Sequence, residues 1–226
     1  MAGMVGENQA GEDEKSARAG AGPDLTQAAL AHLFEQRLDF AGLASPGDLR
    51  LHGSEEGAPA ALRDAAVLIG IVPRPVGLNV ILTRRPDHLG SHPGQVAFPG
   101  GRIDPSDDGP IAAALREAEE EIGLSPSLVD VRGVLDPFAT GTGFKVFPVV
   151  GFVDSYFVAK INADEVAEEF EVPFAFLMDP KNHLEKTAEF RGRLRTYYEM
   201  PYGGQRIWGA TAHMIVKLYC RLYGTP

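Results

Sequence analysis

The strongest constraint on the fold is an amphipathic helical pattern in residues 110–122, between a glycine-rich loop and Gly123. Because helical residues advance by roughly 100° each, the apolar residues of this segment share one stripe. Such a stripe packs against a neighbouring element, and strand-like segments precede and follow it in the sequence. We therefore expect a helix that packs on a β-sheet and ends at Gly123. The stripe consists of Ile111, Leu115, Ala118 and Ile122.

The same segment carries Glu117, Glu120 and Glu121 on a different side, in an arc of roughly 100°. Carboxylates crowded in this way repel one another, and two of them, with Glu119, lie in the last turn, where the helix dipole disfavours each anion by about 0.3–1 kcal/mol. A divalent cation would offset this repulsion, because hard cations such as Mg²⁺ prefer oxygen ligands and also bind substrate phosphates. The run of glutamates alone leaves a second interpretation open, a solvated helix face without a ligand.

Strands and helices follow one another without regular alternation along the rest of the chain. This pattern predicts an α/β (α+β) fold in which a mixed β-sheet lies between helices. Further helices are expected after Asp24, at residues 163–170 and at residues 208–222. The expected strands are residues 65–72, 78–82, 128–135, 145–153, 186–190 and 194–200, the last two forming a hairpin.

The N-terminal region differs in composition from the remainder. Residues 1–22 are rich in Gly, Ala and Glu and predict a disordered tail, and residues 23–60 predict a helix followed by a linker. One folded domain is expected over residues 61–226. The first residues lack the apolar core of a signal peptide, and no run of about 18 apolar residues occurs, so we expect a soluble cytoplasmic protein without a membrane partner.

The charge balance argues against a nucleic-acid-binding surface, because 31 acidic residues oppose 21 basic ones and the net charge is -10. A small basic pocket for one phosphorylated metabolite remains compatible with this balance. The single cysteine, Cys220, excludes an intrachain disulfide.

The segment that ends in Arg116-Glu117-Ala118-Glu119-Glu120-Glu121-Ile122-Gly123-Leu124 resembles the Nudix box. Gly100 and Gly101 precede it, as a glycine loop does in that family. Asp108 stands where most forms of the box have glutamate, and one extra residue lies between Gly101 and Arg116, as in one branch of the family. The resemblance implies a Nudix α/β/α sandwich and a metal-dependent pyrophosphohydrolase.

Residues 81–101 resemble the motif that accompanies the box in coenzyme A pyrophosphatases, with matches at Thr83, Arg85, Gly94 and residues 98–101. The similarity extends over residues 61–222. One departure concerns recognition, since Gly90 stands where that branch has an arginine suited to the 3′-phosphate. The basic residues that remain for this role are Arg84, Arg85, Arg102 and Lys145.

This resemblance implies cleavage of coenzyme A or its derivatives to 3′,5′-ADP and 4′-phosphopantetheine, with Mg²⁺ or Mn²⁺ as cofactor. It implies that Glu117, Glu120 and Glu121 bind metal and act in catalysis, and that Arg116 fixes a glutamate of the box. General-base candidates are Glu117, Glu121 and, from the helix expected at residues 163–170, Glu168. The residues expected to bind substrate are Arg84, Arg85, Phe98, Gly100, Gly101 and Arg102.

Two other functions stay open. Gly90 favours a Nudix hydrolase with another substrate, such as ADP-ribose, a dinucleotide or a nucleoside triphosphate. A non-catalytic nucleotide-binding module is disfavoured, because such proteins are expected to lose glutamates of the box. A homodimer is compatible with the resemblance. The aromatic residues Tyr197, Tyr198, Tyr202 and Trp208 are predicted to pack rather than to stack on a base.

Overall fold

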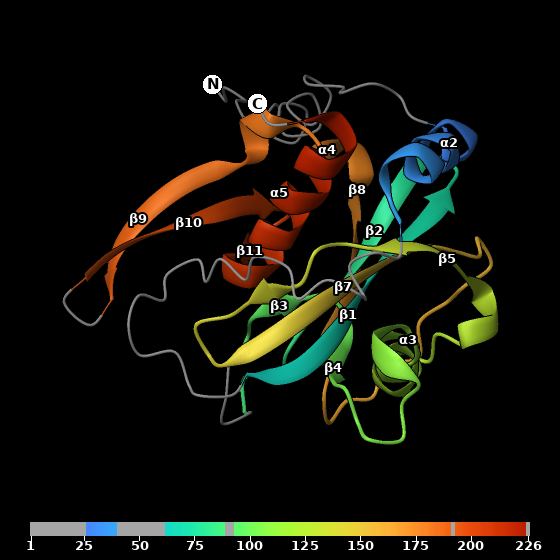
Figure 1. The fold of residues 1–226 in the computed structure, drawn as a ribbon, viewed down its shortest axis with the longest axis horizontal. Helices are drawn as coiled ribbons and strands as arrows, with labels where there is room; N and C mark the ends of the chain where they lie inside the picture. Colours follow the sequence, from blue (N-terminus) through green and yellow to red (C-terminus); the bar gives the residue numbers. More distant parts are fainter. Residues whose placement is uncertain (1–25, 40–61, 89–92, 191–192, 225–226) are drawn as a thin grey trace, which may run out of the picture.

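β1 and β7 run parallel at the centre of an eight-stranded sheet, and the other pairings in it are antiparallel (Figure 1). This description comes from a computed structural model and covers residues 26–39, 62–88, 93–190 and 193–224. The mixed sheet expected from the sequence is therefore confirmed. Its strands are β1 (Arg63–Arg74), β2 (Gly77–Arg84), β3 (Val96–Ala97), β4 (Gly100–Arg102), β5 (Val129–Val134), β6 (Phe138–Ala139), β7 (Phe144–Val153) and β8 (Glu168–Pro173).

Helices cover both faces of this sheet, as Figure 1 shows. α3 (Gly109–Ile122) packs on one face, and α2 (Gln27–Arg37) with α5 (Gly209–Tyr223) packs on the other. Successive residues of β1 consequently enter different cores, Ala65 on the α5 side and Ala66 on the α3 side. Both faces are buried, so the strand is apolar almost throughout. None of the described helices combines the length and apolarity needed to cross a membrane.

α3 follows the predicted bounds closely. Ala118 and Ile122 are fully buried, and Ile111 and Leu115 pack against the same core. Gly123 ends the helix in a left-handed conformation at φ 69°, which favours glycine. The apolar stripe therefore sets how α3 is rotated against the sheet, and this rotation directs the glutamates toward the edge near β4.

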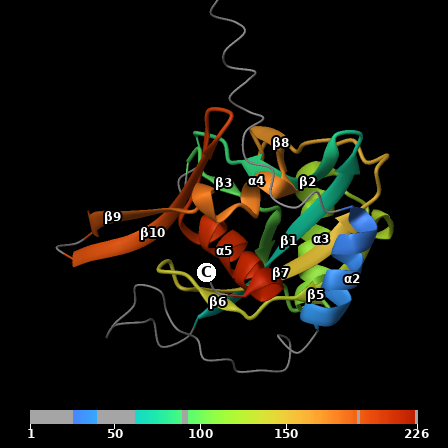
Figure 2. The ribbon, with the colours of Figure 1, turned by 90° about the horizontal axis from the view of Figure 1, so that it is seen from above.

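A second sheet is built by the C-terminal third of the chain. It consists of β9 (Leu184–Phe190), β10 (Arg193–Tyr202) and β11 (Gln205–Trp208), and the β9–β10 hairpin extends away from the body of the protein (Figure 2). β11 leads directly into α5. The short helix α4 (Phe174–Leu177) connects β8 to this sheet, and two 3-10 turns lie at Pro126–Leu128 and Pro180–Asn182.

The helix predicted for residues 163–170 is wrong. A turn occupies residues 163–165, and β8 begins at Glu168 and pairs with β2. Arg84 and Glu168 are direct partners in this register and form an ion pair. Pairing with the edge of β2 and the ion pair with Arg84 therefore override the local helical preference of this Glu-rich segment. The tail expected at residues 1–22 and the linker at residues 44–58 lie outside the described residues.

Candidate functional site

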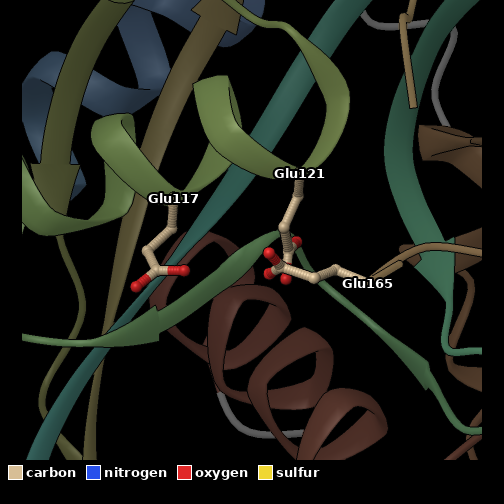
Figure 3. Close-up of side chains that lie close together, drawn as sticks. All are labelled: Glu117, Glu121 and Glu165. Carbon is tan, nitrogen blue, oxygen red and sulfur yellow. The ribbon is translucent and has the colours of Figure 1, made fainter. Parts of the chain in front are cut away.

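Three carboxylates meet beside the C-terminal half of α3. Glu117 and Glu121 project from successive turns of the helix, and Glu165 reaches them from the turn that precedes β8 (Figure 3). One oxygen of each lies within 4.8 Å of those of the other two. Hard oxygen donors gathered from two separate segments form a set that suits Mg²⁺ or Mn²⁺.

Glu121 is the most buried member, with 5% of its surface exposed. Burial raises the pKa of its carboxyl to about 8, and the negative charges of Glu117 and Glu165 act in the same direction. Two influences oppose this rise, a hydrogen bond of 3.2 Å donated by the backbone N–H of Gly100 and the positive charge of Arg85. No described cation forms an ion pair with Glu121, so its negative charge is incompletely compensated.

The glycine loop brings backbone against these carboxylates. A Cβ atom added at Gly101 would overlap the carboxylate of Glu117, and one added at Gly100 would overlap the backbone of β1. Gly100 also has a φ of +155°. Gly100 therefore requires glycine for the path of the chain, and a side chain at position 101 would displace the Glu117 carboxylate.

Arg116 links the loop before α3 to the carboxylates. Its guanidinium lies 2.9 Å from Asp107, 3.1 Å from Glu117 and 3.0 Å from Glu120. It also donates a hydrogen bond to the backbone oxygen of Arg102. The hydrogen bond from Arg116 holds the pKa of the Asp107 carboxyl below its usual range. Arg116 therefore acts as a positioning residue that restrains Glu117 and β4.

Glu117 differs from Glu121 in having this cationic neighbour. Burial raises the pKa of Glu117, Arg116 opposes the rise, and Glu120 and Glu165 reinforce it. Glu120 itself is half exposed and directs its carboxylate to Arg116, outside the group of three. Glu119 is exposed, as the helical geometry predicts for its position.

The residues predicted to bind substrate occupy different surroundings. Arg84 pairs with Glu168 and lies 3.7 Å from Asp87. The positive charge of Arg85 acts on Glu121, and its Nε atom is buried without a hydrogen-bond partner among the described residues. Phe98 is buried in the core on the α5 side, and Arg102 is exposed on β4.

The sequence pattern did not indicate Glu165 as a site residue. Residues 165–168 were part of the family resemblance, but the expected helix favoured Glu168. In the structure, Oε2 of Glu168 accepts hydrogen bonds from Arg84 and from Gln205. The turn that presents Glu165 is held by the side chain of Asn162, which donates to Glu165 and accepts from the backbone of Asp164.

A cavity of about 510 Å³ lies between the turn after β6, the β9–β10 hairpin and the start of α5. Tyr197 and Trp208 were predicted to pack, and their rings do contact each other at 5.9 Å between centroids. Both also line the cavity, as does Tyr198, whereas Tyr202 packs against Phe176. Some of these aromatic residues thus both pack against another ring and line the cavity, and the local sequence does not show which of them do so.

A mixed sheet between helices, with a glycine loop set against glutamates on the following helix, defines the class of Nudix-type metal-dependent hydrolases. Residues 62–197 match the NUDIX domain family. The chain therefore belongs to the Nudix family and is a Nudix hydrolase, an enzyme of the pyrophosphatase type.

Relatives support this membership over most of the described domain. The uncharacterised Nudix hydrolase NudL of Shigella flexneri is 43% identical over 164 residues, which are 73% of this chain and 85% of that protein. NudL of Escherichia coli K12 is 44% identical over the same share of each chain.

Solved structures with a similar course of the chain include two Nudix proteins. The NUDIX domain of Shewanella oneidensis NrtR complexed with ADP ribose is 18% identical, with a TM-score of 0.47, over 75% of this chain and 94% of that one. The Nudix hydrolase RenU of M. smegmatis is 28% identical, with a TM-score of 0.45, over 54% of this chain and 77% of that one.

Proposed function

We propose that this enzyme hydrolyses the diphosphate of coenzyme A or its derivatives to 3′,5′-ADP and 4′-phosphopantetheine. The observation that carries the hydrolytic part of the proposal is the group of Glu117, Glu121 and Glu165 beside the glycine loop. The sequence resemblance of residues 81–101 to coenzyme A pyrophosphatases supports the substrate. We further propose a cytoplasmic enzyme, with neither nucleic acid nor membrane as partner, and an assembly of two identical chains is compatible with these assignments.

The donor set fits a divalent cation. All three groups offer carboxylate oxygens, and no described cation forms an ion pair with Glu121 or Glu165. We assign Mg²⁺ or Mn²⁺ to these three residues, with Glu120 as a further ligand once its side chain leaves Arg116. When bound, such an ion neutralises the diphosphate, stabilises charge in the transition state and acidifies a water molecule.

The surrounding residues orient the reactants. Gly100 and Gly101 let the backbone approach the phosphates, and Phe98 supports this loop from the core. Arg85 is directed toward the diphosphate, because its charge acts at Glu121 and its Nε atom has no partner among the described residues. We assign Arg84, which forms an ion pair with Glu168, to the same substrate-binding region.

The base that removes the proton from water belongs to the carboxylate group. Glu168 was one of three candidates, but one of its oxygens accepts hydrogen bonds from both Arg84 and Gln205. We therefore place the base at Glu117 or Glu121, whose side chains share one side of α3.

A second substrate class follows from one position. Gly90 stands where the resembling branch has an arginine, and it lies outside the described residues. This departure favours a Nudix hydrolase acting on another nucleoside diphosphate derivative, such as ADP-ribose or a dinucleotide. Both alternatives use the same carboxylates and differ in the groups that flank the diphosphate.

Product analysis tests the proposal. The purified full chain is incubated with coenzyme A and Mg²⁺ or Mn²⁺, and the products are separated by chromatography, with Glu121→Gln as the control. We expect 3′,5′-ADP that requires both the metal and Glu121. If ADP-ribose or a dinucleotide is hydrolysed and no 3′,5′-ADP is released from coenzyme A, the enzyme is a pyrophosphohydrolase with a substrate other than coenzyme A.

A further inference from the structure

Two arginines converge on one aromatic ring, and one of them, Arg102, directly follows the glycine loop of the candidate active site. The Cζ atom of Arg63 lies 4.1 Å from the ring centroid of Phe144, and that of Arg102 lies 5.9 Å from it. Arg63 and Phe144 are direct partners in the β1–β7 pairing, and Arg102 pairs with Ala65. Since residues two apart on a strand share a face, all three side chains lie on the α5 side of the sheet.

Neither of these two cations has an acidic partner in the described part of the chain. Among the described residues, no carboxylate forms an ion pair with Arg63 or Arg102. Stacking on a ring fixes the plane of a guanidinium and leaves its N–H edges available. Two such groups around one ring repel each other, and an anion with several acceptor oxygens would relieve this repulsion.

The other basic residues near the site are engaged differently. Arg84 pairs with Glu168, and Arg116 pairs with Asp107, Glu117 and Glu120. Lys145 lies over the ring of Phe147, on the α3 side of the sheet. Among the four residues available for the missing arginine at position 90, Arg102 shares an aromatic ring with a second arginine.

β4 connects the arginine pair to the carboxylates, with the Arg102 side chain on the α5 side of the sheet and α3 on the opposite side. Arg102 directly follows Gly101, which contacts Glu117, and the backbone oxygen of Arg102 is held by Arg116. Arg63 donates its backbone N–H to Gly143, in the turn whose residues Thr140 and Gly141 line the large cavity. The arginine pair is thus connected through the backbone of β4 to the candidate active site and through the turn at Gly143 to the cavity wall.

We propose that Arg63 and Arg102, held by Phe144, bind a phosphate monoester carried on the sugar of the substrate, and so select substrates that bear this group. This inference rests on the proposed function for its substrate, coenzyme A, whose 3′-phosphate is such a monoester. The two arginines take the place of the arginine that is absent at Gly90.

Binding of product-like nucleotides tests the inference without requiring turnover. The dissociation constants of 3′,5′-ADP and 5′-AMP are measured by calorimetry for the full chain in the presence of Mg²⁺. We expect 3′,5′-ADP to bind at least about tenfold more tightly, because charge-assisted hydrogen bonds to a phosphate are strong. Arg63→Gln and Arg102→Gln should each lower this preference by about three- to tenfold, and the double variant should abolish it.

A matched control is Arg132→Gln, which removes an arginine that also lies over a phenylalanine ring, that of Phe152, but pairs with Glu35 and Asp130. It should keep the full preference. Equal binding of the two nucleotides by the wild-type protein, or a preference that survives the double substitution, would overturn the inference.

Kinetics with coenzyme A and 3′-dephospho-coenzyme A separate this inference from the proposed function. We expect Arg63→Gln to lower kcat/KM for coenzyme A and to leave that for the dephosphorylated form within about twofold. If neither compound is hydrolysed while 3′,5′-ADP remains the preferred ligand, the proposed substrate fails and the phosphate site stands. If both are hydrolysed at equal rates, the phosphate site fails and the proposed function stands.

Discussion

Two carboxylates of this enzyme, one part-buried and one buried, have pKa values that are shifted in opposite directions. Glu171 on β8 and Glu121 on α3 are both partly or wholly removed from water, and burial acts to raise the pKa of each. At Glu171, hydrogen bonds from Arg74 and Asn79 overcome this effect and lower the pKa. At Glu121 no described ion-pair partner exists, and the pKa rises to about 8.

The difference distinguishes a structural ion pair from a ligand site. Arg74 also donates to the backbone oxygens of Ser155 and Phe157, so its network ties β1, β8 and a loop together without any added group. The group around Glu121 instead gathers like charges, which is unfavourable until a cation binds. The direction of the pKa shift therefore separates a carboxylate that has a cationic partner within the protein from one that would gain its cation by binding a metal ion.

The largest expected effect is the loss of activity in Glu121→Gln. A bound metal supplies several kcal/mol of transition-state stabilisation, so removal of its most buried ligand should lower kcat/KM by about 100-fold or more. Steady-state kinetics with Mg²⁺ and with Mn²⁺ measure this. Without metal, the Glu121→Gln variant should unfold at the same urea concentration as the metal-free wild type or a higher one, because it replaces a carboxyl that is destabilised by burial beside like charges.

Glu119→Gln is the matched control for this variant, since it removes the same charge from the exposed side of the same helix turn. It should keep kcat/KM within about twofold, as expected of a surface substitution. Comparable losses in Glu119→Gln and Glu121→Gln would contradict the assignment of the ligand side of α3.

Glu171→Gln should have the opposite profile, with stability reduced and activity retained. Loss of the charged acceptor weakens the hydrogen bonds from Arg74 and Asn79, and we expect the free energy of unfolding at pH 7 to fall by about 1–3 kcal/mol. Urea denaturation and kcat measured on the same preparation check both halves. A stable variant without activity would mean that Glu171 belongs to the active site.

A smaller effect is expected for Glu165, which is exposed but lies in the carboxylate group. Glu165→Gln should weaken Mn²⁺ binding by about tenfold, in the range measured for supporting groups at metal sites. Calorimetric titration with Mn²⁺ measures this, and the neighbouring exposed residue provides a control in Asp164→Asn. Equal affinity in the two variants would restrict the metal ligands to α3.

The parts of this fold that could be predicted from sequence are those set by local periodicity. The apolar stripe of α3 and the position of Gly123 determine where the helix packs and ends, and both follow from residues within a few turns of one another. Glu117 and Glu121 then share a side because of helical geometry alone. The arrangement of these two glutamates was accordingly foreseeable.

The parts that could not be predicted depend on pairing between distant segments. Residues 163–170 have a helix-compatible composition, and it is pairing with β2 and the ion pairs with Arg74 and Arg84 that make residues 168–173 a strand. Glu165 reaches the carboxylate group because this strand begins where it does. The convergence of Arg63 and Arg102 likewise depends on the register of β1 with β4 and β7.

The smallest effect is a change with pH in the stability difference between the wild type and Glu171→Gln. The folded-state pKa of Glu171 is lower than its ordinary value of 4.5, so the folded protein favours the charged form. The resulting stabilisation is fully present above pH 4.5 and is lost as the pH falls through the folded-state pKa. We expect the difference in unfolding free energy to be constant from pH 7 to about pH 5 and to shrink below that.

Burial and the charge of Glu171 also raise the pKa of Glu169, so the comparison is repeated in a Glu169→Gln background. A difference that stays constant down to pH 3 would show that Glu171 stabilises the fold through its shape and neutral hydrogen bonds, and the contrast with Glu121 would then lose its electrostatic basis.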